Sequence, residues 1–420
     1  MAKIVIMGQG YVGLPLAMLA AEAGHTVVGF DVSEERVKRI AAGESFVEDV
    51  APERLLAVLD SGAYRPTTEE RELGGFDVAV ISVPTPLREG VPDLSHIESA
   101  ARILGRFLRQ GATIVLESTT YPGTTEELVA PILEEFSGLT AGTDFHLGYS
   151  PERIDPGNRT WTLERTPKVV SGIDEASLAA IDTFYAGLID TTVPVGSPKV
   201  AELTKLVENT FRHVNIALVN ELAMYAHTLG IDVWEAIDAA ATKPFGFMKF
   251  TPGPGVGGHC LPVDPVYLSW QVERKVGRLF RFVELANHIN DHMPGYVVQR
   301  LIYGFNERGR ALKGARVLLL GLAYKPDTGD ARESPATRVV EGLLRLGAEV
   351  RAVDPHVVEG HGVDPRLARV ELTAQEVADA DAVVLLTDHS AFDLELVAQH
   401  AAYVLDCRRK IPAGPTVEHL

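Results

Sequence analysis

The sequence predicts an α/β protein that contains two Rossmann-like doubly wound domains joined by a long central helix. Three observations predict this class. Short apolar runs alternate with helical stretches at the start of the chain, the same alternation returns from Ala315, and a long stretch without internal glycine or proline separates the two. Strands that alternate with helices favour a parallel sheet covered by helices on both faces.

The first half of the chain supplies a series of strand-like runs. Lys3–Gly8 is a short apolar run, and glycines and a helical stretch, Leu14–Ala23, follow it. Thr26–Asp31 is a second such run, and it ends in an acid. Phe76–Val83 and Ala112–Glu117 are further apolar runs of the length of buried strands. We expect all of them to lie in one parallel sheet.

The turn after the first run has the spacing of a dinucleotide site. Gly8, Gly10 and Gly13 form GxGxxG between a strand and a helix, which is the context that this motif requires. Asp31 follows about 20 residues later, where a carboxylate accepts hydrogen bonds from ribose hydroxyls and repels a 2′-phosphate. The sequence therefore predicts NAD as cofactor. NADP remains open because Arg36 could receive a 2′-phosphate, and so does a turn that binds no nucleotide.

The central helix is expected from Pro198 to Leu229. Its apolar and small side chains recur every three or four residues at Leu203, Leu206, Val207, Thr210, Phe211, Val214, Leu218 and Leu222. About 30 helical residues extend roughly 45 Å, which is long enough to bridge two domains or two subunits. Two shorter helices with an unmarked break are the alternative.

Two polar residues of this helix are candidates for catalysis. Lys205 and Asn209 are four residues apart, so they point to one side, where they could bind a developing oxyanion. The alternative is a solvated polar face on which Glu202 and Glu208 pair with Lys205.

Cys260 is the candidate nucleophile. We expect residues 245–265, which are rich in glycine and proline, to form a loop, and in it Cys260 follows His259 and precedes Asp264 by four residues. A thiol in such surroundings is either reactive or structural, and the sequence does not decide between the two. Cys407, at the end of a later strand, is interpreted as structural, and the two cysteines are interpreted as reduced thiols.

Two further segments follow predicted strands. Ligands bind at the carboxyl edge of open parallel sheets, and the segment from Tyr149 to Gly157 follows a strand there, which makes Glu152 a candidate base or part of a charged turn. The segment from Thr119 to Gly123 lies at another such edge and could supply hydroxyl groups.

The last third repeats the opening pattern. Arg316–Leu320 and Val350–Asp354 echo the first two strands, and Asp381–Thr387 and Tyr403–Asp406 echo the later ones. Gly321 ends the first of these runs, but the three-glycine spacing is missing, so any nucleotide binds differently here. With a helix predicted over residues 280–309, we expect three domains at residues 1–196, 197–300 and 312–420.

Composition excludes several classes of protein. The chain has 420 residues, of which 46% are apolar and 23% charged, so disorder or coiled coil is not expected for most of it. A net charge of −18 disfavours nucleic-acid binding, which needs a surplus of Lys and Arg. No uninterrupted apolar run reaches the ~20 residues that span a bilayer. We expect a soluble, cytoplasmic protein that binds neither nucleic acid nor membrane.

Six segments resemble one family. They are GQGYVGLPLA from Gly8, ESTTYPGTTEE from Glu117, SPERIDPG from Ser150, ELTKLVENTFRHVNIALVNELA from Glu202, PGPGVGGHCLPVDP from Pro252 and GLAYKPDTGDARESP from Gly321. Over nearly its whole length the chain resembles the nucleotide-sugar 6-dehydrogenases of the UDP-glucose/GDP-mannose dehydrogenase superfamily. The resemblance implies oxidation of a sugar C6 alcohol to a carboxylate with two NAD.

The resemblance also implies roles for the candidates. Cys260 would attack the C6 aldehyde to give a thiohemiacetal, which then becomes a thioester. Lys205 with Asn209 would stabilise the alkoxide or oxyanion, and Glu152 would activate the water that cleaves the thioester. Asp264 would orient a water or assist Lys205.

The binding residues are likewise implied by the resemblance, and no metal is among them. Thr120 would aid water or substrate placement, the long helix would form a homodimer, and the ligand would be a UDP-sugar. Cofactor contacts are expected from Gly8, Gly10, Tyr11, Val12, Gly13, Asp31, Arg36, Pro84, Thr85, Thr120 and Arg332, and substrate contacts from Glu152, Arg153, Ile154, Lys205, Asn209, Lys249, Phe250, Gly257 and Lys325.

The sugar is ranked by the resemblance alone. His259 stands where many UDP-glucose enzymes have serine, and AAATKPFGF, PGPGVGGHC and SPERIDPGN are more similar to enzymes of UDP-N-acetylhexosamines. UDP-N-acetylglucosamine therefore ranks first, before UDP-glucose and UDP-N-acetylmannosamine. The alternatives are a two-electron hydroxyacid dehydrogenase of the 6-phosphogluconate type and an NAD-responsive scaffold without activity.

Overall fold

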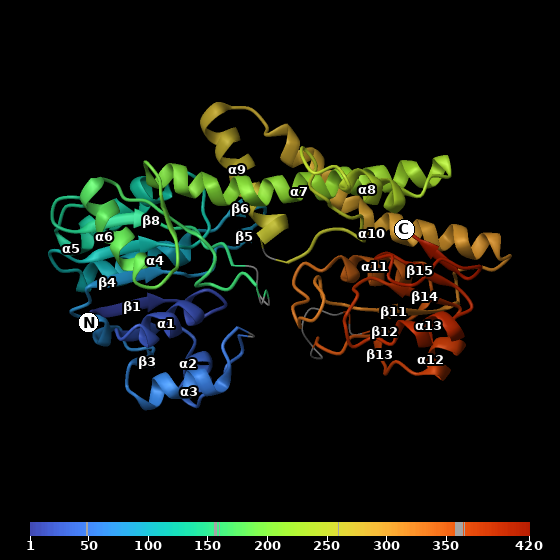
Figure 1. Cartoon of the computed structure of the whole chain (residues 1–420), viewed down its shortest axis with the longest axis horizontal. Coiled ribbons are helices and arrows are strands. Elements are labelled where there is room, and N and C mark those ends of the chain that lie inside the picture. The colour runs from blue at the N-terminus through green and yellow to red at the C-terminus, as the bar shows by residue number, and fades with distance from the viewer. Residues whose placement is uncertain (48, 155–157, 159, 259, 358–363, 365) are drawn as a thin grey trace. The chain divides into compact units, whose positions relative to one another are not determined.

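The computed structural model describes residues 1–47, 49–154, 158, 160–258, 260–357, 364 and 366–420. Its contacts divide the chain into two compact units. Unit 1 consists of Met1–Glu208 and Trp270–Val276, and unit 2 consists of Asn209–Ser269 and Gly277–Leu420. Each contains a six-stranded sheet (Figure 1).

The sheet of unit 1 has the strand order β3-β2-β1-β4-β7-β8, and all its neighbours are parallel. Its strands are β1 Lys3–Met7, β2 Thr26–Phe30, β3 Tyr64–Thr67, β4 Val78–Ile81, β7 Thr113–Leu116 and β8 His146–Tyr149. The order reverses direction between β1 and β4, and dinucleotides bind at the carboxyl ends of such a pair. β4 and β7 are buried along their whole length, because parallel strands are covered on both faces.

Helices cover this sheet. Ile4 and Ile6 of β1 share one core with side chains of α1, α3 and α6, whereas α4 and α5 pack on each other. The helices of unit 1 are α1 Gly13–Glu22, α2 Glu34–Ala41, α3 Pro52–Asp60, α4 Ser95–Phe107, α5 Ala130–Ser137 and α6 Glu175–Ala186, with the 3-10 helix η1 Glu70–Leu73 and the π-helix η2 Thr125–Val129. The pairs β5 Leu87–Arg88 with β6 Val91–Pro92, and β9 Lys168–Val170 with β10 Thr192–Pro194, form two small sheets.

The sheet of unit 2 repeats the same order as β13-β12-β11-β14-β15-β16, again all parallel. Its strands are β11 Arg316–Leu320, β12 Glu349–Val353, β13 Ala368–Arg369, β14 Ala382–Leu385, β15 Val404–Asp406 and β16 Val417–His419. α10 Arg281–Glu307 and α11 Pro335–Arg345 pack in one core on this sheet, and α12 Ala374–Asp379 and α13 Leu394–His400 pack in another. A sheet with two helical layers is doubly wound, as predicted.

The two sheets also share the turn after their first strand. Gly8 follows β1 with φ +92° and Gly321 follows β11 with φ +88°, a conformation that glycine adopts without strain. A backbone N–H after each glycine donates to the acid that ends the second strand, from Gln9 to Asp31 at 2.8 Å and from Leu322 to Asp354 at 2.7 Å. The predicted echo between the two ends of the chain is confirmed.

One continuous helix, α7 Pro198–Leu229, begins in unit 1 and ends in unit 2 (Figure 1). The alternative of two helices with a break is therefore wrong. Polar side chains of α7 are buried, namely Glu202, Lys205, Thr210, His213 and Asn220, and apolar ones are exposed, namely Val200, Leu203, Val207, Phe211, Leu218, Leu222, Tyr225 and Leu229. Leu206, Ala217, Val219, Ala223 and Ala226 are buried as well, so α7 has apolar side chains on both its buried and its exposed face.

The predicted loop over residues 245–265 is wrong at its end. α8 Val233–Ala241 precedes it, but helix α9 Cys260–Val276 already begins at the cysteine. Pro262 is the third residue of α9, and the first turn tolerates proline because its N–H groups have no acceptor within the helix. Pro265 lies further inside the same helix, so both prolines that suggested a loop belong to α9. Among the described residues, no helix is both long and apolar enough to cross a bilayer.

Candidate active site

The glycine turn after β1 leaves room for a ligand on one side only. A Cβ on Gly13 would meet the carbonyl oxygen of Gly8 at 1.9 Å, and a Cβ on Gly8 would meet the carbonyl oxygen of Ser82 at 2.7 Å. A Cβ on Gly10 would meet nothing within 4 Å. Two glycines are thus required by packing inside the protein, and the third faces open space at the N-terminus of α1. This arrangement fits a pyrophosphate, which approaches the backbone at such a position.

Asp31 organises the turn. Its carboxylate is buried and accepts hydrogen bonds from the backbone N–H groups of Gln9 at 2.8 Å and Ser33 at 2.9 Å, and it forms an ion pair with Arg36 at 2.9 Å. Arg36, the residue that left NADP open, is thereby committed to Asp31. Tyr11 is exposed and Val12 half-buried in the same turn.

Gln9 is a structural residue that the sequence did not single out. Its side chain is fully buried, donates to the carbonyl oxygen of Ile6 at 2.9 Å and accepts from the hydroxyl of Tyr64 at 2.7 Å. Burial raises the pKa of Tyr64, so that hydroxyl stays protonated and donates. A Cβ on Gly29 would collide with Gln9, and this glycine in an otherwise branched strand was the available signal.

Three more cofactor candidates follow β4 and β7. Pro84 is exposed and Thr85 buried after β4, and Thr120 is completely buried after β7. The Thr120 hydroxyl lies 2.6 Å from that of Thr124, which also donates to the carbonyl oxygen of Tyr121. All of these residues lie at the carboxyl edge of the sheet of unit 1.

Glu152 and Lys205 come together from segments 53 residues apart. The Lys205 ammonium donates to the backbone carbonyl oxygen of Glu152. The Glu152 side chain accepts a hydrogen bond from the N–H of Ile154. Arg153 pairs with Glu208 at 2.6 Å and donates to the carbonyl oxygen of Pro167 at 2.7 Å.

Lys205 therefore does not pair with its acidic neighbours on α7. Glu202 instead accepts hydrogen bonds from the N–H groups of Gly123 and Thr125 and from the Thr125 hydroxyl, at 2.6–2.9 Å. The solvated polar face considered for this part of the helix is wrong, because Glu202 and Lys205 are both buried.

A buried charged cluster next to Glu152 was not predicted from the sequence. The Lys168 ammonium lies 2.6 Å from Glu117 Oε1 and 3.7 Å from Glu152 Oε2, and the Tyr185 hydroxyl donates to Glu117 at 2.7 Å. Burial lowers the pKa of Lys168, but Glu117 and Glu152 outweigh it and raise this pKa overall. The signals in the sequence were a lysine that begins a short apolar strand and a glutamate that directly follows another.

In unit 2, Asn209 donates through Nδ2 to Asp264 Oδ2 at 2.5 Å, and Asp264 is almost completely buried. Asn209 follows Lys205 by one turn of α7, and Asp264 lies in the first turns of α9, four residues after Cys260. The side chain of Cys260 and the whole of His259, Asp155, Pro156 and Gly157 lie outside the described residues.

The glycine loop before Cys260 packs on the segment after β11. A Cβ on Gly257 would meet Tyr324 at 2.7 Å and the carbonyl oxygen of Glu333 at 2.8 Å, and the Gly258 N–H donates to the carbonyl oxygen of Arg332 at 3.1 Å. The Gly253 N–H donates to Asn220 of α7 at 2.9 Å. The loop is thus held on two sides within unit 2.

The remaining candidates are dispersed over unit 2. Lys249 is exposed and pairs with Asp238 of α8 at 2.5 Å, and Phe250 packs edge-on against Phe211. Lys325 is half-buried in the segment after β11. The Arg332 guanidinium makes a bidentate contact with Asp330, at 2.8 and 2.6 Å.

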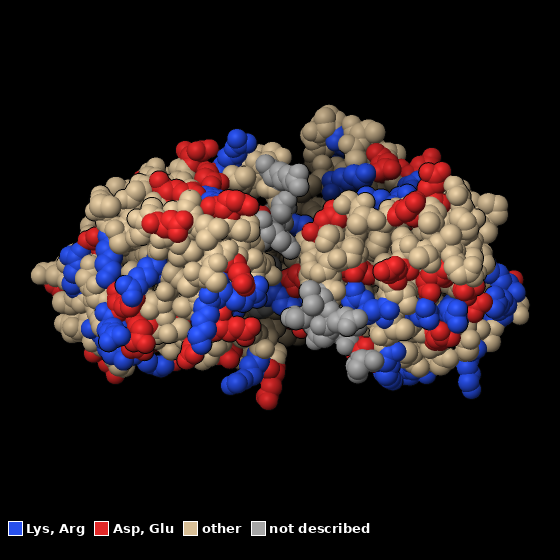
Figure 2. Space-filling view, turned by 90° about the horizontal axis from the view of Figure 1, so that it is seen from below, with Lys and Arg blue, Asp and Glu red and all other residues tan. Residues whose placement is uncertain are grey.

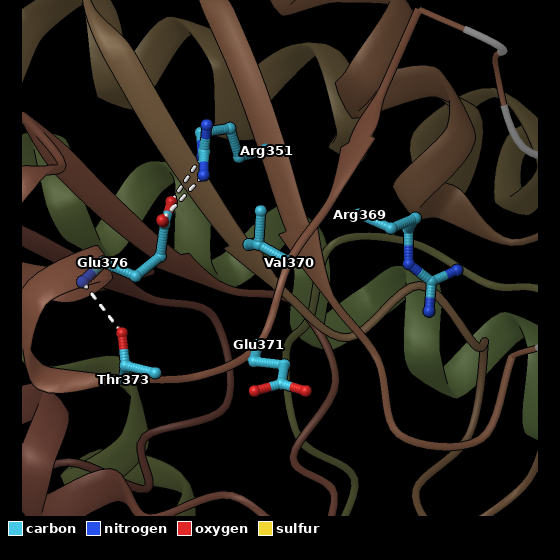
Figure 3. Close-up of a pocket in the computed structure, with 6 residues that line it drawn as sticks. All are labelled: Arg351, Arg369, Val370, Glu371, Thr373 and Glu376. Carbon is cyan, nitrogen blue, oxygen red and sulfur yellow. Dashed lines mark hydrogen bonds and ion pairs between the residues drawn. The ribbon is translucent and has the colours of Figure 1, made fainter.

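A cavity of about 560 Å³ lies at the edge strand β13 and contains none of the predicted site residues (Figure 3). Both of its arginines are engaged: Arg351 makes a bidentate pair with Glu376, and Arg369 donates to the carbonyl oxygens of Asp354 and Val357. It is lined by Arg351, Arg369, Val370, Glu371, Thr373 and Glu376. We do not regard it as the active site.

In the described part of the chain, Asp327, His356 and His389 are a group of possible metal ligands, with one ligand atom of each within 4.8 Å of the others. Both ring nitrogens of His389 are engaged, Nδ1 with the Asp327 N–H at 2.9 Å and Nε2 with Asp354 at 3.0 Å. A metal would have to break one of these bonds. Figure 2 shows acidic and basic side chains interspersed over the viewed face, without a broad basic area.

Comparison with known proteins identifies the three parts of the chain. Residues 2–189 match the NAD binding domain of the UDP-glucose/GDP-mannose dehydrogenase family, residues 199–292 its central domain, and residues 318–412 its UDP binding domain. The chain is 38% identical to UDP-N-acetyl-D-mannosamine dehydrogenase of Pyrococcus horikoshii, over 93% of this chain and 90% of that protein. It is 36% identical to UDP-N-acetyl-D-glucosamine 6-dehydrogenase of Pseudomonas aeruginosa, over 93% and 91%.

Solved structures agree with these matches. The UDP-D-ManNAc dehydrogenase structure from Pyrococcus horikoshii superposes with a TM-score of 0.90 at 35% identity, covering 99% of this chain and 98% of that one. A UDP-glucose dehydrogenase from Pyrobaculum islandicum superposes with a TM-score of 0.87 at 29% identity, over 100% and 98%. The protein therefore belongs to the UDP-glucose/GDP-mannose dehydrogenase family and is an NAD-dependent oxidoreductase.

Proposed function

We propose that this enzyme oxidises the C6 hydroxyl of a UDP-sugar to a carboxylate, with UDP-N-acetylglucosamine giving UDP-N-acetylglucosaminuronic acid as the first choice. One observation carries the proposal. A single turn of α7 bears Lys205, bonded to the segment of Glu152, and Asn209, bonded to Asp264 on the helix that Cys260 begins. A cation, an amide, two carboxylates and a thiol are the groups that two oxidations with an acyl intermediate require.

The first oxidation gives an aldehyde at C6 and releases the hydroxyl proton to solvent water. NAD, when bound, accepts one hydride in each of the two oxidations. Lys205 and Asn209 stabilise the negative charge on the C6 oxygen. The Cys260 thiolate then adds to the aldehyde carbon to give a thiohemiacetal, and loss of the second hydride leaves a thioester on the sulfur.

Hydrolysis completes the reaction. Glu152 takes a proton from the attacking water, the new C–O bond forms, and the C–S bond breaks to return the thiolate. Asp264 holds Asn209 by the contact described above, and in our proposal it orients the water or assists Lys205. Thr120 helps to position the water or the substrate.

The binding residues are proposed in the same way. NAD is held by the glycine turn and its neighbours, Gly8, Gly10, Tyr11, Val12, Gly13, Asp31, Arg36, Pro84, Thr85 and Thr120, with Arg332. The UDP-sugar is held by Glu152, Arg153, Ile154, Lys205, Asn209, Lys249, Phe250, Gly257 and Lys325. We propose three functional domains for these roles, at residues 1–196, 197–300 and 312–420.

UDP-N-acetylmannosamine is the second candidate substrate. It is favoured by the Pyrococcus horikoshii relative and structure, whose names specify that sugar, and the Pseudomonas aeruginosa relative favours the first. NADH formation with UDP-N-acetylglucosamine, UDP-N-acetylmannosamine, UDP-glucose and GDP-mannose, measured side by side, separates them. A clear preference for UDP-glucose contradicts both N-acetylhexosamine candidates and leaves the reaction class intact.

The reaction class is tested by counting NADH. The wild-type enzyme is expected to form two NADH for each sugar consumed, and Cys260→Ser to lose turnover while NAD still binds, because a serine hydroxyl does not replace the thiolate. Cys407→Ser is the matched control, since Cys407 is buried and burial raises its pKa to about 12. One NADH per sugar, or full turnover by Cys260→Ser, contradicts the proposal.

We also propose that the enzyme is a homodimer through α7. The apolar stripe of this helix, formed by Val200, Leu203, Val207, Phe211, Leu218, Leu222, Tyr225 and Leu229, is exposed in the single chain. A contiguous apolar surface rarely faces water in a monomer. A second copy of the same helix supplies a self-complementary cover.

A further inference from the structure

The charged cluster behind Glu152 has no role in the reaction as described so far. It consists of Glu117 at the end of β7, Lys168 at the start of β9 and Tyr185 on α6. All three side chains are buried, whereas Glu152, which follows β8, keeps 12% of its side chain exposed. Buried ionic groups of this kind carry a large desolvation cost, so each needs a partner.

The contacts fix Lys168 firmly. Its ammonium pairs with Glu117 at 2.6 Å, donates to the carbonyl oxygen of Pro151 at 3.2 Å, and lies 5.1 Å from the centre of the Tyr185 ring. Tyr185 in turn donates to the same Glu117 oxygen at 2.7 Å. Glu117 is thus the anchor of the ammonium. The hydrogen bond to Pro151, the residue before Glu152, holds the ammonium next to the Glu152 segment.

The same ammonium faces the proposed base. It lies 3.7 Å from Glu152 Oε2, and the other Glu152 oxygen accepts a hydrogen bond from the N–H of Ile154. The two oxygens are therefore held from different sides. Among the described residues of this segment, two further charged contacts are present. Lys205 donates to the backbone carbonyl of Glu152, and Arg153 is neutralised by its ion pair with Glu208.

Lys168 stands between two carboxylates. Glu117 and Glu152 both contact one ammonium, so they are near neighbours in a mostly buried site. Two carboxylates that share a site cannot both ionise easily, and one of them retains a proton unless a cation compensates. A protonated Glu152 accepts no proton from water.

We propose that Lys168, anchored by Glu117 and Tyr185, is a positioning residue that keeps Glu152 ionised and oriented for thioester hydrolysis. This inference rests on the proposed function of Glu152. It predicts that loss of Lys168 slows hydrolysis of the thioester and leaves the two hydride transfers largely intact.

Lys168→Met and Lys168→Arg are the test pair, because methionine keeps the length of the side chain and arginine keeps its charge. For Lys168→Met we expect a rapid burst of two NADH per active site and steady-state turnover about tenfold or more slower at pH 7. We expect the acid limb of the turnover rate to move to higher pH, because Glu152 and Glu117 then face each other without the ammonium between them. Lys168→Arg restores both. The assay uses NAD and the sugar that gives NADH with the wild type.

Glu117→Gln separates positioning from general loss of structure. It removes the competing carboxylate and leaves Lys168 facing Glu152, so the acid limb stays or moves to lower pH, opposite to Lys168→Met. Shifts of both variants in the same direction overturn the inference. An unchanged acid limb in Lys168→Met with normal turnover also overturns it, and leaves the proposed function standing.

Thermal stability, which does not depend on activity, distinguishes the role of Lys168 from the proposed function of the enzyme. Thermal melts of the wild type, Lys168→Met, Glu152→Gln and the double variant form a cycle. At pH 8 the double variant is expected to melt higher than Lys168→Met alone, because removing Glu152 relieves the repulsion from Glu117. Additive shifts overturn the inference. A wild type that forms one NADH per sugar contradicts the proposed function, whatever the melts show.

Discussion

At the scale of single residues, Gly10 and Gly13 stand in one turn but have different surroundings. A Cβ on Gly13 would meet the Gly8 carbonyl oxygen at 1.9 Å, and one on Gly10 would meet nothing within 4 Å. Gly13→Ala is therefore expected to destabilise the protein by about 1–3 kcal/mol through overpacking and to lose NAD binding.

Gly10→Ala is the matched control, because it should affect NAD binding without affecting stability. It should fold with unchanged stability and weaken NAD about tenfold or more, because the methyl group occupies the side where the pyrophosphate approaches. Calorimetric NAD titration and thermal melting measure the two effects. Equal NAD affinity of Gly10→Ala and wild type would contradict the placement of the cofactor at this turn.

Glu202 carries a pH-dependent part of the stability. Burial raises its pKa to about 7, although the N–H groups of Gly123 and Thr125 and the Thr125 hydroxyl oppose this. Near pH 4.5 and below, folded and unfolded chains both hold the proton. As pH rises from 4.5 to 7 the unfolded chain releases it first, so stability falls over this window by an amount on the order of 3 kcal/mol.

Glu202→Gln is expected to abolish this fall, since the amide does not titrate. Urea unfolding of wild type and variant between pH 4.5 and pH 8 measures it. Glu208→Gln, which removes a partly exposed partner of Arg153 on the same helix, should differ from wild type by no more than about 1 kcal/mol throughout. A constant difference between wild type and Glu202→Gln over the whole range would contradict the prediction.

At the scale of elements, α7 takes part in both the proposed active site and the proposed dimer interface. Several of its polar side chains are buried, and a stripe of its apolar side chains is exposed. Leu222→Glu places a charge in the middle of the apolar stripe, so we expect the dimer to become a monomer, as measured by size-exclusion chromatography with light scattering. Leu346→Glu, at a residue of similar exposure after α11, should leave the dimer unchanged. A wild type that is monomeric at micromolar concentration would exclude the proposed interface.

At the scale of the whole molecule, the two units have separate cores. The core around β1 belongs to unit 1, and the cores on both faces of β11 belong to unit 2. We expect scanning calorimetry to resolve two transitions and NAD to shift that of unit 1 more, because all proposed NAD contacts except Arg332 lie in unit 1. A ligand at 100 times its Kd stabilises the unit that binds it by about 2.7 kcal/mol. One transition, moved as a whole by NAD, would contradict this expectation.

The sequence by itself determined the fold class and the family and favoured NAD as the cofactor, because each depends on local patterns. Strand length and apolar content predict β1 and β11, the spacing of Gly8, Gly10 and Gly13 predicts the NAD turn, and the absence of glycine and proline predicts an unbroken α7. The start of α9 at Cys260 was missed because proline suits both a loop and a first helical turn.

Only the tertiary structure decided which polar groups meet. The period of α7 predicts a helix but not which of its faces is buried, because the period is the same for either face. Lys168, Glu117 and Tyr185 are ordinary residues in sequence, and their cluster exists because β7, β9 and α6 bring them together from up to 68 residues apart. Charge compensation in a buried site depends on distances in space, and the sequence holds only distances along the chain.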